Sequence, residues 1–194
     1  MITGVAGVGK STIIQELCRA LNLTWGDYGD LMLEVMGETE KDKIQYLDWE
    51  TKRSVYDQVE NLIAERFNRQ NFDGRITILE NHLTVIQDNI VVSFPVEDYE
   101  KYNLIGLVSL TASPQAILER RLKDPIRKRL TETLELIEKQ QVINAEEAYK
   151  ISKYLQIPYI DIINNDGKLP VAEVKRWSRK LIFGVNQVMH SERS

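Results

Sequence analysis

The sequence predicts an α/β fold in which a five-stranded parallel sheet is covered by helices on both faces. Short apolar runs rich in β-branched residues supply the five strands, at residues 1–3, 23–25, 75–79, 104–110 and 158–163. Segments with helical spacing of apolar residues separate most of these runs, and alternation of strand and helix is typical of a parallel sheet. Several runs are apolar without interruption, as expected of strands buried on both sides.

The first strand is unusual, because residues 1–3 give it only about three residues. Strands in globular proteins usually have five or six residues. Either the true start of the chain lies upstream, or the sheet tolerates a short strand in its middle. The helix that follows has an apolar face formed by Ile13, Ile14, Leu17, Cys18 and Leu21. Segment 50–68 shows the same helical spacing at Val55, Val59, Leu62, Ile63 and Phe67.

Three further helices are predicted in the second half of the chain, each with a residue type that favours helix starts. They run from Ser113 and Pro114 to about Leu122, from Thr131 to near Leu155, and from Pro170 to about Val188. The remaining residues, 189–194, form a polar tail that we expect to fray. Residues 1–188 are therefore predicted to form one domain.

The composition is that of an ordinary globular protein, with 43% hydrophobic and 28% charged residues and a net charge of −4. An acidic balance argues against nucleic acid as a partner. No apolar run approaches the roughly 20 residues that span a bilayer, and Met1 leads directly into the first motif. The one cysteine, Cys18, excludes a disulfide framework and a cysteine-based zinc site. We therefore expect a cytoplasmic protein without membrane contact.

The strongest motif lies at residues 4–11, which fit the phosphate-loop (P-loop) pattern G-x-x-x-x-G-K-[ST] in full. Its glycines let backbone N–H groups approach phosphate oxygens, and the helix that follows directs its positive dipole end at the same anion. Lys10 is predicted to bind the β- and γ-phosphates, and Ser11 to bind Mg²⁺. The residues expected to bind ATP here are Gly4, Gly7, Val8, Gly9, Lys10, Ser11 and Thr12. The alternative, a glycine-rich turn that matches by accident, does not explain the strand before it and the amphipathic helix after it. With this motif, the predicted α/β fold is specifically a three-layer P-loop NTPase fold.

A basic cluster at residues 120–129 contains six arginines and lysines in ten positions. Phosphoryl transfer needs positive charge around the oxygens that gain charge, and arginine supplies it in a fixed geometry. Arg121, Arg127 and Arg129 are therefore candidate catalytic residues beside Lys10. The alternative is a solvated loop held by salt bridges, which is common for charge runs.

The candidate site also includes two residues that follow the third predicted strand. Glu80 stands where a water-mediated contact to Mg²⁺ is expected, so Ser11 and Glu80 are the predicted metal ligands. His82 either orients a phosphate or has a structural role in the turn that follows.

With these residues identified, the chain resembles the archaeal-type adenylate kinases, a branch of the nucleoside monophosphate kinases, from residue 2 to about 169. Residues 27–32 (Asp-Tyr-Gly-Asp-Leu-Met) resemble the family's Asn-Tyr-Gly-Asp-Phe-Met, and residues 121–129 resemble its short lid. The resemblance implies ATP on the P-loop, AMP under the second helix, a lid without zinc and a homo-oligomer, specifically a homotrimer. It implies a monophosphate-binding segment at about 27–70 and a lid at about 121–131. It also places Gly29 and Asp30 near the monophosphate, and Asn165 near the adenine.

The departures from the family fall on the acceptor side. Where the resemblance leads us to expect arginines, the chain has Lys41 and Gln45, and later Ile86 and Gln87. Loss of bidentate arginine contacts weakens phosphate binding, unless lysine or arginine on the next helix replaces them. The residues predicted to bind the acceptor are Gly29, Asp30, Lys41, Arg53 and His82, with Lys52 as a further candidate.

Three functions follow from these observations. The first is an adenylate kinase that converts Mg·ATP and AMP into two ADP. The second is a P-loop kinase with another small phosphate acceptor, which the missing arginines favour. The third is a nucleotide-dependent switch or assembly ATPase that binds a macromolecular partner through residues 84–94, a hairpin-like stretch that could equally be a covered insertion.

Overall fold

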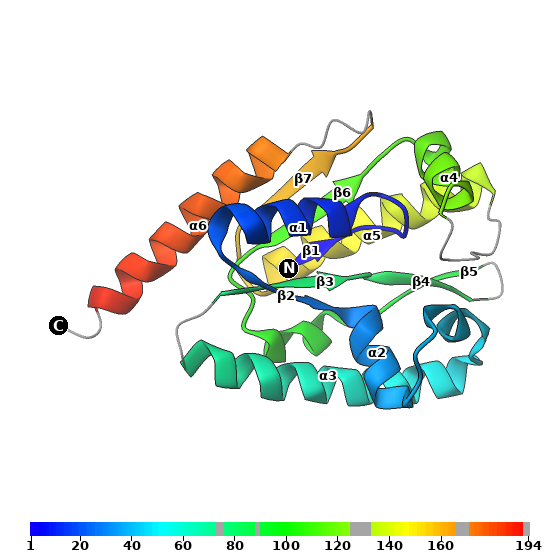
Figure 1. The fold of residues 1–194 in the computed structure, drawn as a ribbon, viewed down its shortest axis with the longest axis horizontal. Coiled ribbons are helices and arrows are strands. Elements are labelled where there is room, and N and C mark those ends of the chain that lie inside the picture. Colours follow the sequence, from blue (N-terminus) through cyan, green and yellow to red (C-terminus); the bar gives the residue numbers. More distant parts are fainter. Residues whose placement is uncertain (73–75, 88–89, 125–132, 166–170, 192–194) are drawn as a thin grey trace.

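The central sheet has five parallel strands, as the sequence predicts, and the structure orders them β2-β3-β1-β6-β7 (Figure 1). The computed structural model describes residues 1–72, 76–87, 90–124, 133–165 and 171–191. Within them the strands are β1 (Ile2–Thr3), β2 (Thr24–Asp27), β3 (Thr77–Asn81), β6 (Leu107–Thr111) and β7 (Tyr159–Ile163). Each pair of neighbours in the sheet is parallel, so the carboxyl ends of all five strands meet at one edge.

The central strand β1 is only two residues long, yet it pairs with a strand on each side. Ile2 lies opposite Glu80 of β3 and Val108 of β6. The strand ends where Gly4 turns the chain with φ of 146°, a conformation in which a Cβ atom would lie 2.6 Å from the carbonyl oxygen of Leu110. The sheet therefore tolerates a short middle strand, because its two long neighbours hold it.

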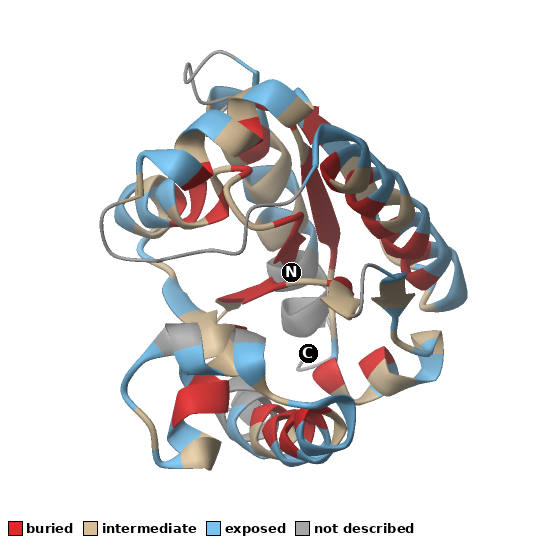
Figure 2. Ribbon diagram, turned by 90° about the vertical axis from the view of Figure 1, so that its right-hand side faces the viewer, coloured by how far each residue is buried: buried red, intermediate tan, exposed pale blue. Residues whose placement is uncertain are grey.

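Helices cover the sheet on both faces, which gives the three layers that the sequence predicts (Figure 1). α1 (Lys10–Leu21) packs with α6 (Val171–Ser191) over one face. On the other face lie α2 (Tyr28–Met36), α3 (Trp49–Phe72), α5 (Leu134–Tyr154) and the 3-10 helix η2 (Val96–Tyr102). Figure 2 shows buried residues along the strands and on the inward sides of these helices. Among the described residues, no helix is both long and apolar enough to cross a bilayer.

Side-chain caps explain where several helices begin. Asp27 at the end of β2 caps α2, since its Oδ1 accepts hydrogen bonds from the backbone N–H groups of Gly29 and Asp30 at 2.7 and 3.2 Å. Ser113 caps α4 (Pro114–Leu122) by accepting from the N–H of Ala116 at 3.2 Å, which confirms the predicted start and end of that helix.

Two predicted helix ends need correction. α5 begins at Leu134, with Thr133 as its N-cap, rather than at Thr131, which lies outside the described residues. Both threonines are followed by acidic residues, so the sequence pattern fits either start. The last helix continues to Ser191 instead of ending near residue 188, because no glycine or proline interrupts the chain between residues 185 and 191. Pro170 also lies outside the described residues.

Two smaller elements complete the carboxyl edge of the sheet. A 3-10 helix, η1 (Lys41–Tyr46), packs against α2. The hairpin-like stretch is an antiparallel pair, β4 (Thr84–Gln87) and β5 (Ile90–Ser93), and both of its strands pack against α5. This packing fits the covered insertion among the two alternatives that the sequence leaves open.

Buried polar side chains of α5 fix the strand ends around the candidate site. Asn144 is 1% exposed, and its Oδ1 accepts hydrogen bonds from the Thr3 hydroxyl and the Leu83 N–H, both at 3.2 Å. One turn earlier, Gln141 Oε1 accepts from the N–H of Ala112 at 2.8 Å. The buried face of α5 thus satisfies hydrogen-bonding groups at or near the ends of β1, β3 and β6 that would otherwise be orphaned.

We predict that Asn144→Ala lowers the free energy of unfolding by about 1–3 kcal/mol, because it leaves the buried Leu83 N–H without an acceptor. Urea denaturation measures the change. The control is Asn61→Ala on the exposed side of α3, which should change stability by less than about 0.5 kcal/mol. Equal effects of the two substitutions would contradict this account of the strand ends.

Candidate nucleotide-binding site

The P-loop, residues 4–11, joins the carboxyl end of β1 to the first turn of α1. Gly7 and Gly9 have φ of 83° and 102°. At Gly9 the requirement for glycine is steric as well, since a Cβ atom would lie 2.5 Å from Nδ2 of Asn164. Gly9 is the N-cap of α1 and has no side chain with which to satisfy the first amides of the helix. Uncapped N–H groups and the helix dipole make this end of α1 suitable for an anion.

The carbonyl groups of the P-loop are bound from the protein side. Lys10 Nζ donates to the carbonyl oxygens of Gly4 and Val5 at 2.9 and 3.3 Å. Arg121 Nε donates to the carbonyl of Ala6 at 2.9 Å. When carbonyls of a loop are held on one side, its N–H groups are left to converge on the other side, which is the geometry of an anion-binding nest.

The carbonyl of Val8 has two donors from different parts of the fold. Asn164, which follows β7, donates through Nδ2 at 2.8 Å, and Arg120 of α4 donates through Nη1 at 3.3 Å. Arg120 also donates through Nη2 to the carbonyls of Asn164 at 2.9 Å and Asn165 at 3.1 Å. The side chain of Asn165 accepts from the N–H of Ser113 at 2.7 Å. The P-loop, α4 and the chain after β7 therefore form one hydrogen-bonded unit.

A polar cluster at the start of α1 combines four of the predicted site residues. Ser11 Oγ donates to Glu80 Oε1 at 3.1 Å, and Lys10 Nζ lies 3.9 Å from the same oxygen. Lys10 Nζ is also 3.4 Å from Nδ1 of His82, and the lysine is 4% exposed. The pairing of β3 with β1 brings Glu80 to this position from a distant part of the sequence.

This cluster fits a Mg²⁺ ion that arrives with ATP. Ser11 and Glu80 present a hydroxyl and a carboxylate, the hard oxygen ligands that Mg²⁺ prefers. The part of the chain that the structure describes has no group of three or more His, Cys, Asp or Glu side chains placed to hold a metal. Mg²⁺ in kinases commonly takes one or two protein ligands together with substrate phosphates and water.

Other predicted residues for ATP lie in different environments. Arg121 is only 7% exposed and packs against the P-loop. Arg127 and Arg129 lie outside the described residues. Thr12 is exposed on the first turn of α1. Arg120 and Asn164 were not predicted as site residues, although the adjacent arginines in the last turn of α4 were visible in the basic cluster.

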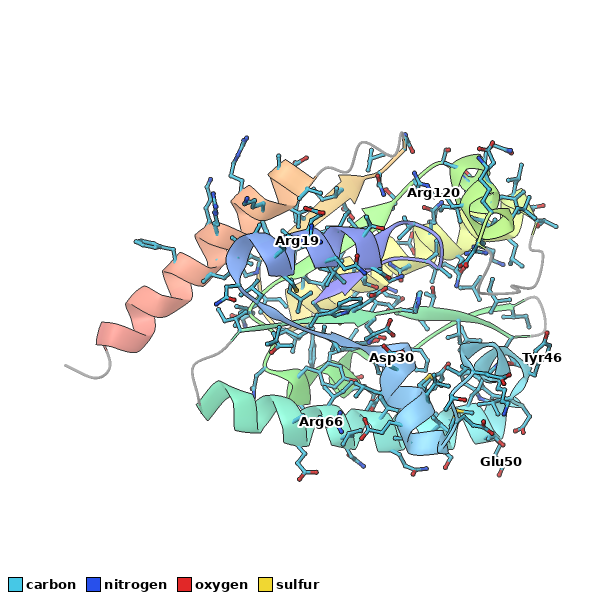
Figure 3. The ribbon with its side chains drawn as sticks, viewed as in Figure 1. Arg19, Asp30, Tyr46, Glu50, Arg66 and Arg120 are labelled. Carbon is cyan, nitrogen blue, oxygen red and sulfur yellow. The ribbon has the colours of Figure 1, made fainter. Side chains whose placement is uncertain are left out.

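On the acceptor side, Gly29 and Asp30 lie in the first turn of α2, next to the end of β3 (Figure 3). Arg53 of α3 forms ion pairs with Asp57 at 3.2 Å and Asp98 at 3.7 Å, so its guanidinium faces η2. Lys41 is the first residue of η1, and its side chain is not among those that the structure describes.

The neighbouring Lys52 differs from Arg53 in its contacts. It is 6% exposed, and its Nζ donates to Oε1 of Gln87 at 2.9 Å. Gln87 ends β4, and β4 follows His82 of the P-loop cluster by two residues. Lys52 thus brings a positive charge from α3 to the strand that leaves the phosphate site.

Aromatic side chains fix the position of α2 relative to α3. The ring of Tyr28 lies 6.0 Å from that of Tyr56, which makes an edge contact with Phe94 at 4.9 Å. Burial raises the pKa of Tyr56 to about 12, and burial also raises the pKa of Tyr28. Burial raises the pKa of Glu60 as well, while a 2.7 Å hydrogen bond from Lys101 opposes the shift. The tyrosines are therefore neutral at ordinary pH and support α2 by packing.

Comparison with known proteins supports the assignment of residues 4–11 as a P-loop. A family model described as an AAA domain matches residues 3–138, which is more than half of the chain. The chain belongs to this family of P-loop kinases. It is therefore a phosphotransferase of the nucleoside or small-molecule kinase type, and its family uses ATP, generally with Mg²⁺.

Curated relatives of this P-loop kinase include archaeal adenylate kinases. The adenylate kinase of Thermococcus kodakarensis is 32% identical over 155 residues, 76% of each chain. That of Thermococcus onnurineus is 30% identical over 172 residues, 85% of each chain. Among solved structures, shikimate kinase from Acinetobacter baumannii in complex with shikimate superposes with a TM-score of 0.60 at 15% identity, covering 94% of this chain and 91% of the other. At that identity the likeness shows the fold.

We predict that Gly9→Ala weakens both stability and ATP binding of this kinase. Alanine at φ of 102° is strained by about 1–2 kcal/mol, and its Cβ also collides with Asn164. Urea denaturation and calorimetric titration with Mg·ATP measure the two effects. The control is Gly184→Ala in α6, where a Cβ meets nothing within 4 Å and which should leave ATP binding unchanged. Normal ATP affinity in Gly9→Ala would contradict the proposed site.

Proposed function

We propose that this kinase transfers the γ-phosphoryl group of Mg·ATP to a nucleoside monophosphate, AMP, and so produces two ADP. The observation that carries the proposal is the arrangement at the carboxyl edge of the sheet. A phosphate cradle with Lys10 and Ser11 lies beside β3. On the other side of β3 in the sheet lies β2, and the last residue of β2, Asp27, caps α2. The curated relatives named adenylate kinase support AMP as the acceptor.

The donor side follows from the contacts around the P-loop. When ATP binds, Lys10 Nζ exchanges its bonds to the carbonyls of Gly4 and Val5 for the β- and γ-phosphates. Ser11 and Glu80 would hold Mg²⁺, and the ion would neutralise part of the phosphate charge of ATP. Arg121 keeps the Ala6 carbonyl turned away from the ATP, so that the loop amides face the phosphates.

The transfer itself needs no protein base. An oxygen of the acceptor phosphate is already anionic and attacks the γ-phosphorus in line. The bond from that phosphorus to the bridging oxygen then breaks, and its electron pair leaves with ADP. The chain's contribution is to place the two substrates and to neutralise the charge that develops on the transferred group.

The acceptor phosphate requires positive charge opposite the P-loop. Gln45 and Gln87 stand where the family resemblance expects charged side chains, and the guanidinium of Arg53 is paired with two aspartates. Lys52 donates a hydrogen bond to Gln87 and lies close in sequence to η1. Among the residues that the structure describes, we assign Lys52 to bind the acceptor phosphate. Gly29 and Asp30 would contact the nucleoside from the start of α2.

The weak arginine complement also favours a second candidate, a P-loop kinase whose acceptor is another small phosphorylated or anionic metabolite. The deciding test is ADP formation from Mg·ATP with AMP, GMP, CMP and UMP as separate acceptors. We expect AMP-dependent ADP formation, and we expect Lys10→Ala to reduce it by on the order of a hundredfold or more. The matched control is Lys150→Ala on α5, whose ammonium pairs with Glu147 far from the P-loop in sequence. No acceptor-dependent turnover with any of the four would contradict the proposal.

The acceptor role of Lys52 is tested separately. Because a charge-assisted hydrogen bond contributes about 1.5–3 kcal/mol, Lys52→Met should raise the KM for AMP by roughly tenfold or more while the KM for ATP stays near its original value. Lys52→Arg should restore part of the loss, and Lys150→Met is the control for general effects of removing a lysine. Equal increases in both KM values would assign Lys52 a structural role instead.

A further inference from the structure

The guanidinium of Arg120 joins two loops that are distant in sequence. It donates to the carbonyl of Val8 in the P-loop and to the carbonyls of Asn164 and Asn165 after β7, at 3.3, 2.9 and 3.1 Å. All three acceptors are backbone atoms, so the contact depends on the path of the chain and on the fork shape of arginine. The side chain is half-buried, as expected of a group that lies between two segments.

Asn164 strengthens the same connection from the other direction. Its Nδ2 donates to the carbonyl of Val8, and its own N–H donates to the carbonyl of Thr111 at 2.7 Å. The residue is 2% exposed, and its amide lies against Gly9, where no Cβ fits. A shift of the chain after β7 would therefore displace the P-loop at Val8 and Gly9.

The contacts of Arg120 and Asn164 lie on the β6–β7 side of the P-loop. β6 and β7 lie on one side of β1, and β3 and β2 lie on the other. Figure 3 shows Arg120 on α4 and Asp30 at the start of α2, on opposite sides of β1. Since the acceptor elements occupy the β3–β2 side, the β7 side is left for the part of ATP that extends beyond its phosphates.

We propose that Arg120 is a positioning residue that couples the phosphate cradle to the nucleoside side of the donor site. Contact of ATP with the chain after β7 then holds the Val8 carbonyl outward and keeps the P-loop amides directed at the phosphates. Phosphate binding, in turn, further restrains residues 164 and 165 through the same hydrogen bonds. The inference rests on the proposed function only in taking ATP as the phosphoryl donor.

The competing account of these contacts is that Arg120 only stabilises the fold. The two roles differ in their effect on ligands that lack a nucleoside. A structural defect in the P-loop weakens ATP and inorganic tripolyphosphate by the same factor. Loss of coupling weakens ATP more, because only ATP can use contacts on both sides of Arg120.

The test compares the dissociation constants of Mg·ATP and Mg·tripolyphosphate for the full chain and for Arg120→Lys. A lysine ammonium cannot span three carbonyls in the geometry of a guanidinium fork. We expect the preference for ATP over tripolyphosphate to fall by roughly tenfold, since charge-assisted hydrogen bonds are lost. The matched control is Arg19→Lys, an exposed arginine of α1 that pairs with Glu16 and should leave the preference unchanged (Figure 3).

An unchanged ratio of the two dissociation constants in Arg120→Lys would overturn the coupling. Absence of any preference for ATP over tripolyphosphate in the unsubstituted protein would overturn it too, because the nucleoside would then make no contact to couple. Failure of the unsubstituted protein to bind Mg·ATP at all would instead refute ATP as donor, which separates failure of the proposed function from failure of the inference. A second measurement uses the unsubstituted protein, so it does not depend on whether a variant folds. Tripolyphosphate should slow hydrogen exchange at the Asn164 amide, and an unaltered exchange rate at that amide would overturn the proposal as well.

Discussion

The carbonyl groups of the P-loop impose the constraint on which the rest of this structure depends. A loop can direct its amides at an anion only if its carbonyls find donors on the other side. Here the donors are charged or amide side chains from three elements: Lys10 for Gly4 and Val5, Arg121 for Ala6, and Arg120 with Asn164 for Val8. The placement of α4 and of the end of β7 beside the loop follows from this need.

The same constraint explains why a two-residue central strand is sufficient. β1 contributes few backbone hydrogen bonds of its own, but β3 and β6 flank it, and Asn144 binds Thr3 at its end. The cradle is thus positioned by its surroundings rather than by the strand that leads into it. The sheet positions the metal-binding residues in the same way, because the pairing of β3 with β1 brings Glu80 next to Ser11. Donor and metal chemistry are therefore assembled by the sheet.

The sequence predicts the local parts of this arrangement well and the long-range parts poorly. The P-loop, the five strands and the Ser113 cap are recognisable because their signals lie within a few neighbouring residues. Arg120 and Asn164 escape prediction because their partners are backbone carbonyls that no residue type marks. Thr131 and Thr133 offer equivalent caps, and only the folded helix distinguishes them. On the acceptor side, the ion pair of Arg53 with Asp98 depends on the packing of η2 against α3, whereas Asp57 lies one turn along the same helix as Arg53.

A crystal structure with Mg²⁺ and a non-hydrolysable ATP analogue tests the central claim most directly. If the cradle is formed before ATP binds, the φ angles of Gly7 and Gly9 should stay near 83° and 102°, and Arg120 and Arg121 should keep their carbonyl partners. Only the Lys10 ammonium should move, from the carbonyls of Gly4 and Val5 to the phosphates. A P-loop that refolds around the analogue, with the Ala6 and Val8 carbonyls released, would contradict this account.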